Sequence, residues 1–197
     1  MADDGPEGPE RDARRRFLGN IMLDVERIDR SVSQLLELGR IEAGATVRDP
    51  VRVAPLIATL EERFPTVRFE AAVGGERMHV RPADFERAVA NLVENALKYR
   101  DTAPPRVRIT AHRPEGSGIC VITVDDNGIG VPPDRREEIF GAFQRLHRRS
   151  EYSGVGLGLS MVKQVVQVLC GSITVHDSPL GGARFELRLP TVPQEGV

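Results

Sequence analysis

The sequence predicts an α+β domain, with a mixed β-sheet covered by helices on one face and preceded by a long helix of the coiled-coil type. Two observations support this prediction. Between residues 51 and 190, segments with alternating apolar residues are interspersed with segments whose apolar residues recur every three or four positions. Ahead of them, residues 13–45 carry a heptad pattern with charged residues between the apolar ones.

The composition limits the possible classes of protein. The chain has 197 residues, enough for one α/β domain and an appendage but not for two full domains. A net charge of −2 gives no chain-wide positive field, so we expect no nucleic-acid partner. The two cysteines exclude a disulfide framework and suit a reducing compartment. No apolar run approaches membrane-spanning length, so we expect a cytoplasmic chain without a membrane segment.

The amino-terminal part divides into a leader and the heptad helix. Residues 1–12 are rich in glycine, proline and acidic residues and are predicted to be disordered. A narrow apolar stripe follows, made of Leu18, Ile21, Val25, Ile28, Val32 and Leu35. Such a stripe is typical of a helix that packs on a partner helix, so we expect a homodimer or mixed bundle through residues 14–43. The alternative is an amphipathic helix lying on its own domain.

The domain from residue 51 to residue 190 is divided by prolines and glycines. The helical pattern predicts helices at residues 53–64, 82–99, 135–140 and 158–169. Alternation predicts strands at residues 67–72, 78–80, 107–112, 119–125, 173–177 and 183–189. Pro65 stops the first helix, Gly74-Gly75 forms a turn between the first two strands, and Gly171 occupies the usual end position of the last helix. Residues 191–197 form a tail.

The first motif, NLVENALKYR, lies on the helix at residues 82–99. Asn91, Asn95 and Lys98 are spaced i, i+4 and i+7, so they share one face of that helix. Amide oxygens coordinate Mg²⁺ and an ammonium group pairs with phosphate, so this face suits an oxygen-rich ligand. Taken alone, the pattern favours an ordinary solvated helix face.

The second motif, VDDNGIGVP, follows a strand. Asp126 stands at the strand end, where a buried carboxylate can accept a hydrogen bond from an exocyclic amine. Gly128 and Gly130 permit positive φ angles and a close approach to a flat ligand. A plain Asn-Gly turn is the alternative.

The third motif, YSGVGLGLS, precedes the last helix. Gly154, Gly156 and Gly158 leave backbone N–H groups free at a helix amino terminus, where they can hold phosphate. Positive charge lies just upstream, at Arg145, Arg148 and Arg149. A solvated loop is the alternative.

In this order and at these separations, the motifs resemble the ATP-binding domain of the sensor histidine kinases, within the superfamily that includes gyrase and the mismatch-repair ATPases. NLVENALKYR resembles the N box, DDNGIG the first glycine box, IFGAFQRL the F box and GVGLGLS the second glycine box. RLHRRSEYSG is similar to the lid of the phytochrome-like kinases. The resemblance covers about residues 51–190 and implies the Bergerat fold, ATP bound under a mobile lid, and Mg²⁺.

The resemblance also implies a role for each matched residue. Asn95 would hold Mg²⁺, Asp126 would accept the adenine amine, and Asn91 and Lys98 would be catalytic residues beside the phosphates. The other nucleotide-binding positions would be Tyr99, Gly128, Gly130, Phe140, Phe143, Arg145, Gly154, Gly156, Leu157 and Gly158.

Asn91 distinguishes between two reactions of this superfamily. The members that hydrolyse ATP place a glutamate one turn before the Mg²⁺-binding asparagine, where it activates water as a general base. The amide of Asn91 cannot abstract a proton. The residue at this position therefore favours phosphoryl transfer over efficient hydrolysis.

The phosphate-accepting histidine is not evident. The heptad helix resembles the second helix of the kinases' dimerisation hairpin, whereas the acceptor lies in the first. The chain's own histidines are outside a dimerisation helix: His79, His112, His147 and His176. We therefore expect a kinase that transfers the γ-phosphate of ATP to a histidine supplied in trans, acts with a response regulator, and does not autophosphorylate as this chain. The alternatives are a non-catalytic ATP-gated module that binds a partner, and a serine kinase of the anti-sigma type.

Overall fold

The structure is a computed structural model that describes residues 50–74, 77–100, 103–142, 144 and 157–191. The expected leader, the heptad helix, nearly all of the expected lid and the tail beyond residue 191 lie outside the described residues. Within these ranges, no helix is both long enough and apolar enough to cross a lipid bilayer.

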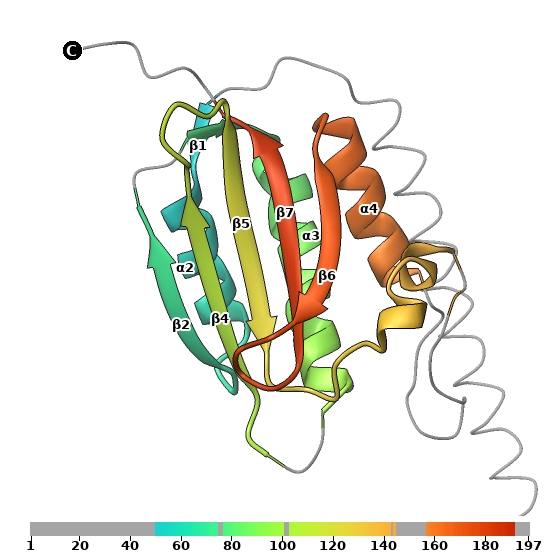
Figure 1. The fold of residues 1–197 in the computed structure, drawn as a ribbon. Coiled ribbons are helices and arrows are strands. Elements are labelled where there is room, and N and C mark those ends of the chain that lie inside the picture. Colours follow the sequence, from blue (N-terminus) through green and yellow to red (C-terminus); the bar gives the residue numbers. More distant parts are fainter. Residues whose placement is uncertain (1–49, 75–76, 101–102, 143, 145–156, 192–197) are drawn as a thin grey trace, which may run out of the picture.

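The described residues confirm the expected α+β class. In chain order the elements are β1 (Pro50–Arg52), α2 (Val53–Arg63), β2 (Arg68–Val73), β3 (Arg77–His79), α3 (Pro82–Lys98), β4 (Arg106–His112), β5 (Ile119–Asp126), the 3₁₀ turns η1 (Pro133–Arg135) and η2 (Glu138–Phe140), α4 (Gly158–Val168), β6 (Ser172–Asp177) and β7 (Ala183–Pro190). One sheet has the strand order β2-β4-β5-β7-β6, and β1 and β3 form a small second sheet. Helices α2, α3 and α4 lie on one face of the larger sheet, and none of the described helices covers its other face, called the open face below, which is turned toward the viewer in Figure 1.

The strands on either side of Gly74, predicted to be connected by a turn, pair with other strands and not with each other. β2 lies at the edge of the larger sheet, parallel to β4, whereas β3 pairs with β1. Met78 of β3 is fully buried and also bridges to Thr191, just beyond β7. A glycine pair predicts a turn but does not specify which strands it joins, and here long-range pairing decides the partners.

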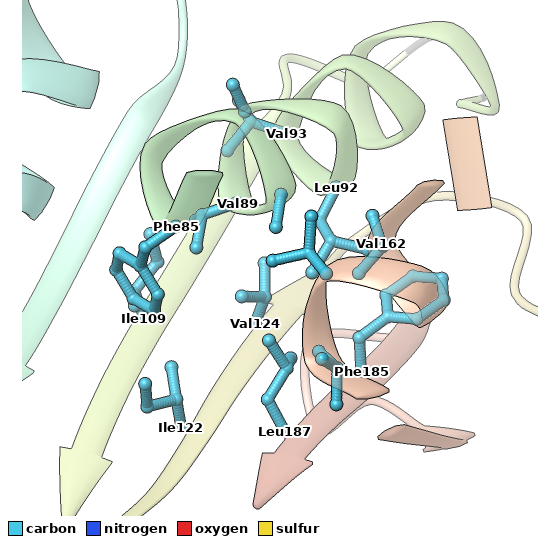
Figure 2. Close-up of a cluster of buried hydrophobic side chains, with 14 of the residues drawn as sticks. Phe85, Val89, Leu92, Val93, Ile109, Ile122, Val124, Val162, Phe185 and Leu187 are labelled. Atoms are coloured by element: carbon cyan, nitrogen blue, oxygen red, sulfur yellow. The ribbon is translucent and has the colours of Figure 1, made fainter. Parts of the chain in front are cut away.

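Helix α3 is built as its sequence predicts. Pro82 stands at its start, Asp84 lies in its first turn, and the backbone N–H of Tyr99 closes its last turn. Its apolar face is buried at Phe85, Ala88, Val89, Leu92, Val93 and Ala96. Figure 2 shows Phe85, Val89 and Leu92 in one cluster with side chains from β4, β5, β7 and α4. Burying each large side chain contributes roughly 1.5–3 kcal/mol, and this fixes which face of α3 remains polar.

Two local predictions were wrong in detail. The helix expected at residues 135–140 is two separate 3₁₀ turns, because Pro132 and Pro133 precede it and Gly141 follows, leaving room only for short turns. At the end of α4, the left-handed residue is Cys170, with φ of 56°, and not Gly171. A glycine is still required at Gly171, because a Cβ there would lie 2.4 Å from the backbone oxygen of Arg188.

An ion-pair cluster between β2 and β4 gives the fold a pH-dependent contribution. Glu70 accepts hydrogen bonds from Arg106 and Arg108, each with a shortest N–O distance of 2.7 Å. These bonds lower the pKa of Glu70 from its ordinary value of 4.5 to about 2. Because the folded-state pKa is the lower one, the stabilisation is present above pH 4.5 and is lost as the pH falls toward 2.

The variant Glu70→Gln should therefore lower the thermal midpoint at neutral pH and have little effect near pH 2. The glutamine keeps the size of the side chain but cannot form an ion pair with either arginine. Melting curves followed by circular dichroism at descending pH measure the difference between the two proteins. Midpoints of variant and wild type that differ by the same amount at every pH would contradict this account of Glu70.

Candidate nucleotide-binding site

A cavity of about 540 Å³, its open mouth included, lies where β5 ends beside α3 and α4. Polar groups come from Asn95 of α3, Tyr99 just after α3, Asp126 of β5 and Gln144. The remaining wall consists of Ile129, Gly130, Val131, Ile139, Leu159, Ala183 and Phe185. A flat apolar ligand with a few polar edges fits such a lining.

Asp126 is the carboxylate of the cavity, and the backbone holds it in place. Its side chain is 6% exposed, and its Oδ1 accepts hydrogen bonds from the N–H groups of Gly128 at 2.8 Å and Ala183 at 2.9 Å. Within the described part of the chain, both of these bonds end on Oδ1. Oδ2 is therefore the oxygen that we assign to a ligand. The sequence predicted the position of this buried carboxylate at the strand end.

Two glycines make this arrangement possible. A Cβ on Gly128 would lie 2.3 Å from the backbone oxygen of Tyr99, and one on Gly182 would lie 2.1 Å from Oδ1 of Asp126. The loop after β5 therefore lies directly against the end of α3, and the turn before β7 lies directly against Asp126. Gly130 adopts a φ of +72°, as expected for a glycine in this loop.

The polar face of α3 meets the cavity at Asn95. The amide nitrogen of Asn95 is buried and has no hydrogen-bond partner among the described residues. Because a flip exchanges the oxygen and nitrogen of an amide, either atom can be turned toward a ligand. A buried polar group is normally hydrogen-bonded, so a lone amide in a cavity wall suits a bound ligand.

The other polar residues of α3 lie beside the cavity and do not line it. Asn91 faces the start of α4, where its Nδ2 donates to Sδ of Met161 at 3.4 Å and its Oδ1 lies next to Gly158. Lys98 donates to the hydroxyl of Tyr99 at 2.8 Å, and its ammonium lies 4.4 Å from the centre of that ring. One side of α3 therefore carries both of these side chains, and the first turn of α4 lies along the same side.

The remaining predicted residues fall into two groups. Phe140 is buried and packs edge-to-face on Phe185 at a centroid distance of 6.5 Å, and Leu157 is buried immediately before α4. They support the cavity wall and the start of α4. The others, Phe143, Arg145, Gly154 and Gly156, lie outside the described residues.

The sequence analysis missed the contribution of β7 and the apolar wall. Gly182 and Ala183 are 56 and 57 positions after Asp126, and strand pairing alone brings them to the carboxylate. The glycine pair of GGARF, residues 181–185, predicts a turn but does not indicate a contact with Asp126. Ile129, Val131, Ile139 and Leu159 stand in or beside the expected motifs, but no local pattern indicates that these side chains face one cavity.

The affinity of this site for a nucleotide should depend on the protonation of Asp126. Burial raises the pKa of this carboxyl, against the two N–H bonds that lower it. Only the ionised carboxylate accepts a hydrogen bond at both oxygens, so affinity for ATP should decrease as the pH falls through the raised pKa.

The effect of Asp126 on the stability of the fold has the opposite sign, because the folded protein holds this proton more tightly than the unfolded chain. The contribution of Asp126 to stability is present below its ordinary pKa of 3.8 and is lost as the pH rises through the folded-state pKa.

Calorimetric titrations at descending pH measure this dependence, with GTP as the control because its phosphates titrate as those of ATP do. We expect the preference for ATP over GTP to decrease as Asp126 is protonated. A preference that stays constant over the whole range in which the protein remains folded would contradict the role in nucleotide recognition that the resemblance implies for Asp126.

Comparison with known proteins gives consistent matches. The family model described as "Histidine kinase-, DNA gyrase B-, and HSP90-like ATPase" matches residues 80–193, more than half of the chain. The "Sensor protein KdpD" of Escherichia coli (strain K12) is 32% identical over 199 residues, covering 91% of this chain. The match spans only 21% of KdpD, so the chain corresponds to about a fifth of the length of that relative.

Solved structures agree with this likeness. The mycobacterial sensor histidine kinase MprB superposes with a TM-score of 0.64 at 27% identity, over 75% of this chain and 100% of that one. The ATP binding domain of PrrB from Mycobacterium tuberculosis gives 0.59 at 29% identity, over 74% of this chain and 98% of that one. The fold of residues 50–191 is therefore the one found in these kinase domains.

Proposed function

The chain belongs to the family of histidine kinase-, DNA gyrase B- and HSP90-like ATPases, and from that premise we propose that it is the ATP-binding catalytic domain of a sensor histidine kinase. The resemblance seen in the sequence motifs is thereby confirmed at the level of the family and the fold. In this proposal the domain transfers the γ-phosphate of ATP to a histidine of a dimerisation helix, and a response regulator receives it afterwards. No observation favours the ATP-gated module or the anti-sigma-type serine kinase.

The observation that carries the proposal is the fixed carboxylate of Asp126 in a mainly apolar cavity. An adenine ring presents a flat apolar surface and one exocyclic amine, and Asp126 offers an acceptor for that amine. Guanine has a carbonyl oxygen at the corresponding place, which would face the carboxylate acceptor to acceptor. The cavity should therefore prefer ATP to GTP.

Asn95 is the residue that we propose to hold Mg²⁺. Its unpartnered amide in the cavity wall fits an oxygen ligand of this cation, which often takes one or two protein ligands beside phosphate oxygens. When bound, Mg²⁺ neutralises charge on the phosphates during phosphoryl transfer. Asn95 would orient the cation from the polar face of α3.

The phosphates would lie toward the start of α4. Among the described residues, no side chain caps the amino terminus of α4 at Leu157, which supports a role for its first N–H groups in binding an anion. Asn91 borders this turn and Lys98 follows two turns later on α3, which supports their proposed place beside the phosphates. Because Asn91 cannot take a proton, the residue at this position does not supply the base that ATP hydrolysis would need there.

The histidines that the structure describes are poor candidates for the phosphate acceptor. His79 pairs with Pro50 in the small sheet, His112 pairs with Val121, five residues before Asp126 on β5, and His176 lies on the edge strand β6 beside Thr174. All three are on strands and not in a dimerisation helix. Their positions support an acceptor supplied by a separate helix, as in the proposed kinase.

Calorimetry with the full chain tests the proposed function. We expect ATP to bind with Mg²⁺, to bind more weakly when the metal is chelated, and to be preferred to GTP. A chain that is folded by circular dichroism and yet binds neither nucleotide would contradict the proposal. Equal affinities for the two nucleotides would remove Asp126 from the recognition of the base.

A further inference from the structure

An ion pair with a fully buried carboxylate and a partly exposed arginine lies on the open face of the sheet, behind the cavity. Asp125 of β5 has a side chain that is 0% exposed, and Arg184 of β7 donates to both of its oxygens, from Nε at 2.6 Å and from a terminal nitrogen at 2.9 Å. Such a bidentate contact fixes the orientation of the two side chains relative to each other as well as their distance. Figure 1 shows β5 and β7 side by side in the middle of the sheet.

This ion pair stands one residue from the contact that holds Asp126. Asp125 and Arg184 face each other in the register of β5 and β7, and theirs is the last pair of that ladder. The next residue of β5, Asp126, accepts its hydrogen bond from the preceding residue of β7, Ala183. Successive side chains of a strand alternate between faces, so the ion pair lies on the open face and Asp126 on the helix face.

The end of the β5–β7 ladder therefore carries the ion pair on one face of the sheet and the Asp126 contact on the other. We call this strand end the junction. A change in register or spacing at the ion pair would move the N–H of Ala183 relative to Oδ1 of Asp126. Gly182 adds to this sensitivity, because its N–H donates to the backbone oxygen of Asp126 at 3.1 Å and a Cβ there would collide with the carboxylate. The position of the carboxylate thus depends on how β7 is held against β5 at this point.

We propose that Asp125 and Arg184 are positioning residues for nucleotide recognition, which lock the end of the β5–β7 ladder and so orient Asp126 toward the adenine amine. The inference rests on the proposed function, because it concerns the base that Asp126 reads. It extends the site to two residues on the opposite face of the sheet, neither of which touches the cavity. It assigns a use to a buried charge that binding of ATP does not itself require.

Another ion pair on the same face provides a matched control. Arg188 donates to Glu186 at 2.8 Å, but both residues belong to β7, so their contact does not join β7 to β5. Arg188 is also more exposed, with 58% of its side chain accessible against 34% for Arg184. Removing Arg188 deletes an arginine from the same strand and face while leaving the junction at Asp126 intact.

The test compares Arg184→Lys, Arg184→Ala and the control Arg188→Ala in the full chain. The lysine variant keeps the positive charge beside Asp125 but loses the planar bidentate contact. The alanine variant loses both the charge and the contact. Affinities for Mg-ATP and Mg-GTP are measured by competition against a fluorescent nucleotide, and thermal midpoints are recorded for each protein. The ratio of the two affinities reports recognition of the base, whereas a loss of stability alone lowers the midpoint and leaves this ratio unchanged.

We expect the preference for ATP over GTP to decrease about tenfold in Arg184→Ala and about threefold in Arg184→Lys, the scale of coupling between residues in contact. The ratio should stay at its wild-type value in Arg188→Ala. An unchanged ratio in folded Arg184→Ala would overturn the inference. If Arg184→Ala does not fold, an unchanged ratio in Arg184→Lys overturns it, and a reduced one supports it. A wild-type chain that binds neither nucleotide would instead contradict the proposed function.

Discussion

Asp126→Asn should weaken the binding of ATP by at least ~1.5 kcal/mol, which is more than tenfold in affinity. The reason lies in the two N–H groups that already bind one oxygen of Asp126. An asparagine must keep its oxygen toward Gly128 and Ala183, so its amide N–H₂ points to the ligand. A donor then meets the amine of adenine, and the charge that strengthened the original bond is gone.

The matched control for this variant is Asp134→Asn. Asp134 is an exposed aspartate in η1 and does not line the cavity, so the same chemical change there should leave the affinity for ATP unchanged. Calorimetry with both variants separates the loss of a specific acceptor from the loss of one negative charge. Equal affinity for ATP in Asp126→Asn and wild type would remove this carboxylate from the site.

Asn95→Ala should abolish the dependence of nucleotide binding on Mg²⁺ while the fold survives. The side chain lies on the polar face of α3, and alanine is a good helix former, so the helix has no reason to unfold. In the alanine variant the amide that we propose as the metal ligand is deleted. Titration of ATP with and without Mg²⁺ should then give the same weak affinity.

Asn127→Ala is the matched control for this second prediction. Both polar atoms of the Asn127 amide have partners within the fold, because Oδ1 accepts from the N–H of Arg106 at 2.8 Å and Nδ2 donates to the oxygen of Pro104 at 3.0 Å. Its loss should lower the thermal midpoint and leave the Mg²⁺ dependence in place. If Asn95→Ala loses its cooperative melting transition, Asn95 has a structural role and the assignment of the metal ligand fails.

The local part of this structure could be predicted from the sequence. The spacing in α3 predicts both its buried face and the polar face that carries Asn95, because helical periodicity relates these residues directly. Asp126 was predicted at a buried strand end because a run of apolar residues leads into it and an Asn-Gly pair follows. In both cases the information lies within a few residues of the position concerned.

The long-range part could not be predicted from single residues. Ala183 reaches Asp126 through the pairing of β5 with β7, and β3 pairs with β1 and not with the strand that precedes it. These contacts depend on how the strands are ordered in the sheet, which periodicity does not specify. The same holds for Gly171, whose need to be glycine comes from the approach of β7 and not from the end of its helix.

Transfer of labelled phosphate from ATP tests the central claim most directly. The full chain is incubated with γ-labelled Mg-ATP, alone and together with a polypeptide that carries the histidine-bearing dimerisation hairpin of a sensor kinase. We predict acid-labile, base-stable label on the histidine of the hairpin and none on the chain itself, and much less label on the hairpin when Asp126→Asn replaces the wild type at an ATP concentration that does not saturate the variant. Acid-labile phosphate on the isolated chain, or an unlabelled hairpin although the chain binds Mg-ATP, would contradict the account.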